Sequence, residues 1–384
     1  MNCPSAPATD SPFRYSMSAI KPLKLAIIGC GAVIDELHVP SLRRLTRQGA
    51  VRVTALVDRS KERMARFKRV FPEAVCFEDA AAAFRSAGAE AALVASPPGL
   101  HRAHVEAAFS NGCHVLCEKP LATSVKDVTE LAGMSERLGL ILMVGLTRRF
   151  FPSLATAGAM LRAGDLGGQV EFRCHEGGVY QWPIASDAPF RREAGGGGVL
   201  MDKGVHVLDS LLWLFGPMSV VGAEDDALAG GVEGNCRVKL AGKEVRGVMQ
   251  LSWDQETANG LHIKGSFGEM RVDPNEFRWI ELRRAQGAWE RRPCRSSWPA
   301  SLKAPAPTTK APRVYEDCIY MQWIQFLRAV ALGEPVPVDG RAALTVAAQI
   351  EAAYASAAPL PQPWLSAEEQ TAAARRHWRN GAKQ

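Results

Sequence analysis

The sequence has no run of about eighteen uncharged apolar residues, so we expect no membrane-spanning segment. The first twenty or so residues carry Pro, Ser and Asp but no apolar stretch, which indicates a tail rather than a signal peptide, and Met17 is an alternative start. Blocks of one charge sign are also missing. The net charge of +6 is small for 384 residues, and basic side chains alternate with acidic ones. Nucleic acid is therefore not an expected partner, whereas small anions remain compatible.

Paired cysteines are missing as well. The nine cysteines form no C-x-x-C pair, which is typical of a reducing compartment, and we expect a cytoplasmic protein. Cys113 with Cys117, and the Cys174-His175 doublet, have metal-ligand chemistry, but they lie in strand-like segments without partner pairs. We predict core or surface thiols at these positions and no metal site.

Composition is that of a globular protein, with 47% hydrophobic and 22% charged residues in a length that suits two or three domains. The hydrophobic pattern divides the chain into a tail (1–21), strand-then-helix units (22–147), a strand-rich domain (148–358) and a polar tail (359–384) that includes one short helical stretch. The repeated units predict an α/β fold with a doubly wound, mostly parallel sheet.

A glycine loop follows the first strand of that sheet, Leu23–Ile28. Gly29 and Gly31 allow a tight turn and let backbone amides approach a pyrophosphate. A helix is expected at about Pro40–Gln48, and a second strand ends in Asp58, which is placed to hydrogen-bond an adenosine ribose. These features favour a dinucleotide site. Asp58 would repel the 2′-phosphate of NADP, which argues for NAD, although the neighbouring Arg59 keeps NADP open.

A charged pair stands at the end of another strand. The apolar run His114–Cys117 ends in Glu118, Lys119 and Pro120. Ligands of open α/β sheets bind beyond the carboxyl ends of the strands, so Lys119 is a candidate catalytic residue. The alternative is a solvated pair that simply closes the strand.

Residues beyond Phe150 change pattern, and their consecutive strands predict a second domain of α+β type with a mainly antiparallel sheet. Turns are expected at Ala241-Gly242 and Asn259-Gly260, and residues 285–313 read as a long surface loop. Helices are expected near Ser153–Ala163, Tyr315–Leu332 and Arg341–Ala357. The expected strands are Gln169–Cys174, Cys236–Leu240, Val245–Trp253, Gly260–Phe267, Glu269–Val272 and Phe277–Leu282.

A run of four glycines, 195–198, leads into an apolar segment of helix length that carries Asp202 and His206. A helix places residues four apart on one face, so Asp202 can orient the imidazole of His206 as a general base. The alternative is a buried histidine that its neighbour steadies. Lys203, one residue from Asp202, is expected to point elsewhere.

The chain resembles the glucose–fructose oxidoreductase / inositol dehydrogenase (Gfo/Idh/MocA) family from about residue 23 to 358. The resemblance rests on the glycine loop with His38-Val39-Pro40, on Ser96-Pro97-Pro98 with His101, on Glu118-Lys119-Pro120 and on the glycine run before Asp202 and His206. It implies an N-terminal Rossmann domain that binds NAD(P), a C-terminal domain whose large open sheet serves dimerisation, and oxidation or reduction of a sugar or polyol. It also implies a cis Lys119-Pro120 bond.

Carried over residue by residue, the resemblance implies that Lys119, Asp202 and His206 are catalytic and that Glu118 contacts the cofactor ribose. The residues expected at the cofactor are Gly29, Gly31, Ala32, Val33, Ile34, Asp58, Arg59, Ser96, Pro97, His101, Glu118 and Lys119. Two positions depart from the family pattern. Ile34 replaces the third glycine of the loop, and Thr147 stands where asparagine is common, which bears on the nicotinamide contacts.

Intrinsic basicity distinguishes the two candidate bases. Lysine titrates near pH ~10.4 and histidine near ~6.5, so Lys119 needs a shift of roughly three units to act at neutral pH, whereas His206 needs almost none. The hypothesis is that His206 takes the hydroxyl proton, Asp202 orients it, and charged Lys119 polarises the same oxygen.

The substrate side is less specific. Arg148, Arg149, Arg191 and Arg192 offer cations for a phosphate or carboxylate, or are structural. Tyr180 and Trp182 can stack on a sugar ring or pack in the core. The substrate site is expected to include Lys119, Arg148, Tyr180, Asp202 and His206.

Three functional classes follow. The first is an NAD(P)-dependent dehydrogenase or reductase of a sugar, polyol or nucleotide-sugar, active as a homodimer or homotetramer. The second is an enzyme that retains NAD and uses transient oxidation for elimination or glycoside cleavage. The third, a non-catalytic sensor, is disfavoured because Lys119, Asp202 and His206 are all present.

Overall fold

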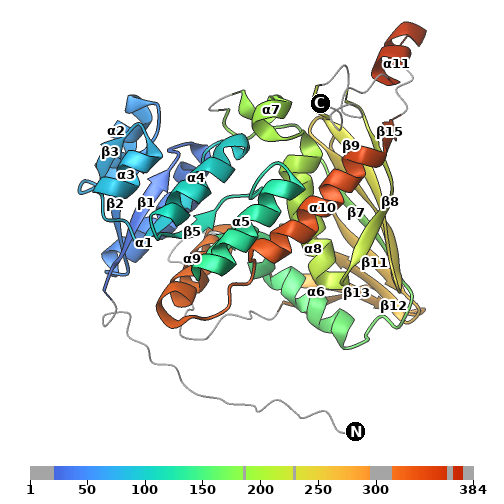
Figure 1. Ribbon diagram of the computed structural model, residues 1–384. Coiled ribbons are helices and arrows are strands. Elements are labelled where there is room, and N and C mark those ends of the chain that lie inside the picture. Colours follow the sequence, from blue (N-terminus) through green and yellow to red (C-terminus); the bar gives the residue numbers. More distant parts are fainter. Residues whose placement is uncertain (1–20, 185–186, 228–230, 295–313, 361–365, 375–384) are drawn as a thin grey trace.

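The computed structural model describes residues 21–184, 187–227, 231–294, 314–360 and 366–374 (Figure 1). Its N-terminal part is a parallel sheet of six strands in the order β3-β2-β1-β4-β5-β6, which confirms the predicted doubly wound α/β fold. The strands are β1 (Leu23–Ile28), β2 (Val51–Val57), β3 (Val75–Phe77), β4 (Ala91–Val94), β5 (His114–Cys117) and β6 (Leu142–Val144).

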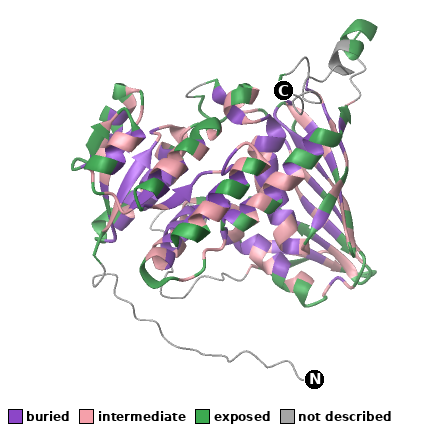
Figure 2. Cartoon of the chain, viewed as in Figure 1, coloured by how far each residue is buried: buried purple, intermediate pink, exposed green. Residues whose placement is uncertain are grey.

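Buried apolar residues make up the centre of this sheet. All four residues of β4 and the last four of β1 are buried, as expected for parallel strands covered on both faces (Figure 2). The covering helices are α1 (Val39–Arg47), α2 (Lys61–Val70), α3 (Ala80–Ser86), α4 (Pro98–Ser110) and α5 (Val125–Leu138). Ser124 caps α5, since its side chain accepts a hydrogen bond from the amide of Asp127.

The first helix begins earlier than its periodicity predicts. Helical backbone starts directly after Gly31, and the segment η2 (Ile34–His38) is a π turn that runs into α1. A π turn changes the angle between successive side chains, so a pattern with a period of about 3.6 residues misses it. The helix α4 begins at Pro98, directly after the Ser96-Pro97 pair.

The second sheet has nine strands in the order β14-β13-β12-β11-β7-β10-β9-β8-β15. Only β7–β10 and β8–β15 pair in parallel, so the predicted mainly antiparallel sheet is confirmed. The strands are β7 (Val170–Glu176), β8 (Met218–Asp225), β9 (Asn235–Gly242), β10 (Val245–Ser252), β11 (Gly260–Gly265), β12 (Gly268–Val272), β13 (Trp279–Arg284), β14 (Glu290–Pro293) and β15 (Ala357–Pro359).

Two local predictions for this sheet need correction. Asn259-Gly260 does not form a hairpin, because β7 lies between β10 and β11. Instead, the side chain of Asn259 accepts a hydrogen bond from the amide of Gly177 and donates one to its carbonyl. The start of the expected surface loop contains β14, and residues 295–313 lie outside the described ranges. The predicted turn at Gly242 does join an antiparallel pair, β9 and β10.

Helices cover one face of the nine-stranded sheet (Figure 1). The remaining helical segments are η3 (Thr147–Phe150), α6 (Pro152–Arg162), η4 (Ala188–Phe190), α7 (Arg192–Gly195), η5 (Leu200–Gly204), α8 (Val205–Phe215), α9 (Val314–Leu332), α10 (Gly340–Ser356) and α11 (Ala367–Ala374). Phe215 of α8 stacks on Phe172 of β7 with ring centroids 5.2 Å apart. By contrast, α9 returns to the first sheet and packs on α1. No helix in the described ranges is long and apolar enough to span a bilayer.

Candidate active site

A cleft of about 370 Å³ lies between the carboxyl ends of the parallel strands and the glycine run of the second domain. One wall comes from the loops that follow β1, β4, β5 and β6, and the other from the segment around η5. The predicted site residues that line it are Val33, Ser96, His101, Glu118, Lys119, Tyr180, Asp202 and His206. The strand ends and the glycine run therefore meet in one cleft.

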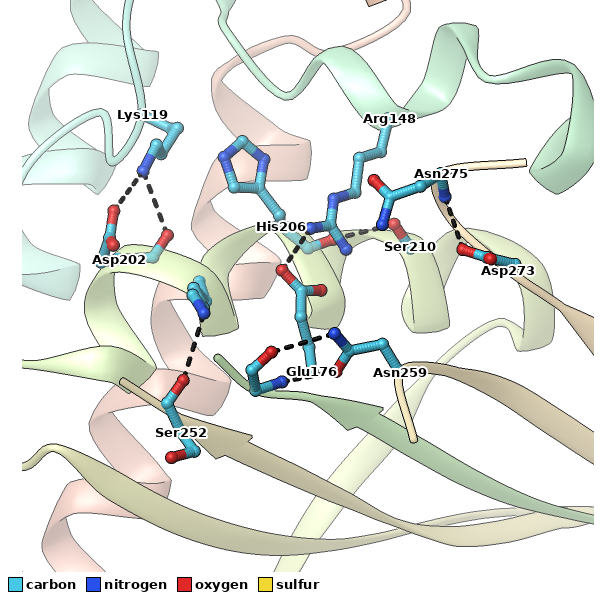
Figure 3. A network of polar contacts seen from close by, with 12 residues as sticks. Lys119, Arg148, Glu176, Asp202, His206, Ser210, Ser252, Asn259, Asp273 and Asn275 are labelled. Carbon is cyan, nitrogen blue, oxygen red and sulfur yellow. Dashed lines mark hydrogen bonds and ion pairs between the residues drawn. The ribbon is translucent and has the colours of Figure 1, made fainter. Parts of the chain in front are cut away.

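Lys119 and Asp202 form an ion pair across this cleft (Figure 3). The ammonium of Lys119 donates to the carboxylate of Asp202 at 2.7 Å and to its backbone carbonyl at 3.1 Å. Burial alone would raise the pKa of Asp202, but the charge and hydrogen bond of Lys119 outweigh it and hold that pKa below its usual value. The pair fixes the ammonium at the place where the two walls meet.

His206 lies between Lys119 and Arg148 (Figure 3). Its Nδ1 is buried and has no hydrogen-bond partner in the described part of the chain. Burial, followed by the positive charges of Lys119 and Arg148, lowers the pKa of His206 well below its usual value. The imidazole is therefore neutral at neutral pH and can accept a proton.

Asp202 makes no hydrogen bond to His206 among the described contacts, although the sequence predicted that it orients the imidazole. Both residues line the cleft, but the carboxylate of Asp202 accepts from Lys119 instead. The physical reason is the π turn over η5, because side chains four residues apart no longer stack there as they do in an α-helix. The same turn corrects the expectation for Lys203, which lines the cleft beside Asp202 and donates to the carbonyl of Ser252.

The glycine run is required by close packing. A Cβ at Gly198 would overlap the backbone of Glu233, and one at Gly197 would overlap the hydroxyl of Tyr354. Glu233 is fully buried, and its carboxylate accepts from the amides of Gly198 and Leu200 and from Tyr354. Glu233 thus caps the helical segment that carries Asp202 and His206, a role that the sequence did not indicate.

Glu118 begins the opposite wall. Its carboxylate is 2.9 Å from Nε2 of His38 and accepts from the amide of Lys119 at 3.2 Å. The Lys119–Pro120 bond is cis, as the resemblance implies. His101 ties this loop to the one after β4, since its two ring nitrogens lie 2.7 Å from the carbonyls of Pro120 and Ser96.

The loop after β1 fits a dinucleotide. Gly29 has φ +94, and a Cβ there would meet the backbone of Ala95 at 2.7 Å, whereas a Cβ at Gly31 would meet open space. Asp58 ends β2, and its carboxylate accepts from the amide of Cys30 at 2.8 Å. It also pairs with Arg63 at 2.7 Å, a partner that sequence reasoning missed. Backbone is thus accessible at Gly31, where helical amides begin.

Other predicted residues have structural partners. Arg148 is paired with Glu176 at 2.7 Å and lies outside the cleft lining, next to His206. Tyr180 lines the cleft and packs edge-to-face on Phe190. The predicted cofactor residues that do not line the cleft are Gly29, Gly31, Ala32, Ile34, Asp58, Arg59 and Pro97. Among the residues that the structure describes, no group of three metal-ligating side chains occurs.

The strand order, the glycine loop with its acid on β2, and a cleft with a neutral imidazole and an ammonium define a class of protein. Dinucleotides bind doubly wound sheets at the point where the strand order reverses, here between β1 and β4. The class is a nicotinamide-dinucleotide-dependent oxidoreductase.

Comparisons with known proteins identify the family. Residues 23–146 match the model described as "Oxidoreductase family, NAD-binding Rossmann fold", and residues 154–271 match "GFO/IDH/MocA C-terminal domain". The chain belongs to the Gfo/Idh/MocA family and is an NAD(P)-dependent oxidoreductase, as the sequence predicted.

Several relatives span nearly the whole chain. D-apiose dehydrogenase of Paraburkholderia graminis is 27% identical over 91% of this chain and 92% of its own length. The rhizopine catabolism protein MocA of Rhizobium meliloti is 27% identical over 84% and 92%. A solved structure of levoglucosan dehydrogenase, in complex with NADH and levoglucosan, has a TM-score of 0.73 at 19% identity and covers 87% of this chain and 97% of that one. It establishes the shared fold.

Proposed function

We propose that this protein transfers hydride between NAD(P) and a hydroxyl or keto carbon of a sugar, polyol or sugar nucleotide. The observation that carries the proposal is the buried imidazole of His206, whose Nδ1 has no hydrogen-bond partner among the described residues, in one cleft with the ammonium of Lys119. Its lowered pKa agrees with a neutral imidazole. One group accepts a proton, and the other stabilises negative charge on the same oxygen. Relatives named as D-apiose dehydrogenase and scyllo-inositol 2-dehydrogenase support a polyhydroxylated substrate.

Three residues of this chain have separate roles in the proposed oxidation. His206 takes the proton of the substrate hydroxyl, and Lys119 donates a hydrogen bond to the oxygen as its negative charge grows. Asp202 keeps the ammonium in place, because it accepts hydrogen bonds from Lys119 through both its carboxylate and its carbonyl. The bound nicotinamide supplies the hydride acceptor. Reduction runs the same steps in reverse.

Substrate recognition would involve the aromatic and basic groups around these residues. Tyr180 and Trp182 line the cleft, and Trp182 is 38% exposed, so its ring is accessible to a sugar face. Lys203 adds a second ammonium near Asp202. Arg148 would act indirectly, through its charge on His206, rather than by touching the substrate.

We also infer a homodimer built on the uncovered face of the nine-stranded sheet. Helices lie on the other face in Figure 1. Cross-strand ion pairs such as Arg246–Glu171 and Arg237–Glu224 order charged side chains on strands of this sheet. Light scattering of the purified protein tests this inference, and a monomer at micromolar concentration would refute it.

The function is tested by cofactor content and turnover on one preparation. The purified protein is denatured, released NAD and NADP are assayed, and fresh protein is then followed at the reduced-nicotinamide absorbance band with sugars, polyols and nucleotide-sugars. Stoichiometric, substrate-dependent formation of reduced cofactor is expected. Product formed with retained NAD and no net reduction would indicate transient oxidation instead, and the absence of both binding and turnover would refute an enzyme.

A further inference from the structure

His38 is a fully buried histidine that the proposed reaction does not use. Its exposed fraction is 0%, and both ring nitrogens have partners. Nδ1 lies 3.0 Å from the indole nitrogen of Trp323, and Nε2 lies 2.9 Å from a carboxylate oxygen of Glu118. The chain Trp323, His38, Glu118 therefore runs from α9 to the edge of the cleft.

The chemistry of tryptophan fixes the protonation of this histidine. The indole N–H is a donor only, so the Nδ1 of His38 must carry a lone pair. A neutral imidazole with a bare Nδ1 carries its hydrogen on Nε2, which then donates to Glu118. A second proton on Nδ1 would place two N–H groups against each other. Trp323 therefore excludes both the other tautomer and the imidazolium form of His38.

Glu118 is held as an acceptor by this arrangement. One of its oxygens accepts from His38 and the other from the amide of Lys119. Both hydrogen bonds favour the ionised carboxylate over the protonated acid. The side chain is only 7% exposed and lines the cleft, at the carboxyl end of β5.

The other titratable groups around Glu118 do not replace His38. Lys119 supplies a charge and a backbone amide, while its ammonium is turned to Asp202. His101 feels the charge of Glu118, but both of its ring nitrogens face carbonyls. Cys117 and Tyr315 feel that charge without a hydrogen bond to the carboxylate in the described structure. His38 is thus the side-chain donor to Glu118.

We propose that Trp323 and His38 are positioning residues that keep Glu118 a carboxylate facing the cofactor half of the cleft, so that helix α9 controls cofactor affinity. The inference rests on the proposed function, because it assumes that Glu118 accepts hydrogen bonds from ribose hydroxyls. Trp323 is 285 positions from His38 in the sequence and fully buried, so the contact depends on the return of α9 to the first sheet.

The tautomer is tested without any cofactor. In protein labelled with ¹⁵N-histidine, two-bond ¹H–¹⁵N spectra report which ring nitrogen carries hydrogen, and a His38→Gln sample assigns the signal among the eight histidines. We expect His38 to show hydrogen on Nε2 and a bare Nδ1, because Nδ1 accepts from the indole of Trp323. In Trp323→Phe, which removes the N–H and keeps a ring, we expect hydrogen to appear on Nδ1 as well. Hydrogen on Nδ1 in the unmodified protein would overturn the proposal.

The consequence for the cofactor is tested by calorimetric titration with NAD. His38→Leu leaves a buried carboxylate without its donor, so the Kd should rise roughly tenfold to a hundredfold. His38→Gln, whose amide can donate from a similar position, should recover most of that affinity. His262→Leu is the matched control, since His262 also sits 2.9 Å from a glutamate, Glu269, but on the second sheet. An unchanged Kd in a folded His38→Leu protein would refute the role.

Trp323→Phe gives a second, pH-resolved readout that a purely structural role would not produce. Without the indole N–H, the His38–Glu118 pair can take up one proton on either residue, and the charge available to the cofactor is cancelled. The Kd of Trp323→Phe should therefore change more with pH than the Kd of the unmodified protein. A Kd that shifts equally at all pH values would contradict the proposal. Failure of the unmodified protein to bind NAD or NADP would refute the proposed function, whereas the tautomer result would stand.

Discussion

Two glycine-rich segments, one in each domain, have the same local structure but place their histidines in different surroundings. Each leads into a helix that begins with a π turn: η2 carries His38 to Glu118, and η5 carries Asp202 to Lys119. The first wall is closed, because His38 is fully buried with both nitrogens bonded. On the second wall, the Nδ1 of His206 has no partner in the described structure. The two walls therefore differ in that the histidine of the first is fully hydrogen-bonded, whereas the histidine of the second has a buried nitrogen without a partner among the described residues.

An unsatisfied buried nitrogen is unfavourable for stability. A buried polar group without a hydrogen bond costs about 1–3 kcal/mol, and such groups are found where function requires them. His206 has such a buried nitrogen. In the described contacts, His38 and Glu118 on the first wall have none. The comparison predicts that substitution of His206 lowers activity without lowering stability, whereas substitution of His38 lowers stability.

The largest effect is expected for His206→Ala. Removal of the proton acceptor should lower kcat by about 10² to 10⁴. Because the buried Nδ1 has no partner, His206→Leu should leave the melting temperature unchanged or raise it, whereas His38→Leu should lower it by several degrees, roughly 4 °C per kcal/mol or less at this size. Turnover and thermal unfolding are measured on the same samples. Normal turnover in His206→Ala would refute its role as the base.

The next effect concerns Glu233, which supports the open wall. Burial raises the pKa of Glu233 from 4.5 to about 7. Since the folded value is the higher one, its contribution to the free energy of unfolding is fully present below about pH 4.5 and is lost as the pH rises to about 7. At ~1.4 kcal/mol per pKa unit, the loss is about 3 kcal/mol. Denaturant unfolding across that range should show it, and Glu233→Gln should abolish it.

A matched control for Glu233 is Glu136→Gln. Glu136 is a solvent-facing carboxyl bonded to Arg341, whose hydrogen bond lowers the pKa of Glu136. Its contribution has the opposite sign, since it is lost as the pH falls, and solvent screening keeps it small. Stability curves with the same pH dependence in Glu233→Gln and in the unmodified protein would show that this carboxyl does not titrate as inferred.

The sequence predicted most of the fold, because its signals are local. Buried apolar runs, capping residues such as Ser124 and the turn at Gly242 each depend on a few neighbouring residues. The contacts that build the site depend on distant residues. Lys119 meets Asp202 across 83 positions, and Trp323 meets His38 across 285. No local pattern encodes such pairs, although the sequence located Lys119 from the end of a strand and Asp202 from the glycine run before it.

The sequence predictions were wrong where contacts between distant segments, or an irregular helical turn, override the local pattern. Asn259-Gly260 has the composition of a hairpin turn, but the insertion of β7 between β10 and β11 is set by sheet assembly. The π turn of η5 changed the partner of Asp202 and brought Lys203 into the cleft. A helical period of about 3.6 residues carries no sign of either π turn.

Cofactor preference provides a test on the closed wall. The carboxylate of Asp58 lies at the end of β2 beside Arg63. Asp58→Ser removes a charge that repels a 2′-phosphate and frees Arg63 to meet it, so the ratio of NADP to NAD affinity should rise roughly tenfold to a hundredfold. Asp79→Ser, which removes a carboxylate at the N-cap of α3 and leaves a residue that can still cap, is the matched control. An unchanged ratio in Asp58→Ser would mean that Asp58 does not face the ribose.

The smallest effect tests whether the two walls are electrostatically coupled through Lys119. Burial, then the charges of Lys119 and Arg148, hold the pKa of His206 well below its usual value, so the acid limb of kcat/KM in the unmodified protein should lie below pH ~6.5. Lys119→Met removes one of these charges, so the pKa of His206 rises and the acid limb of the residual activity moves to higher pH. Lys203→Met is the matched control, because Lys203 lines the same cleft but is not among the charges that act on His206. An identical displacement in both variants would assign the effect to the general charge of the cleft. No displacement in Lys119→Met would show that Lys119 does not act on His206, and would leave burial and Arg148 as the causes of its low pKa.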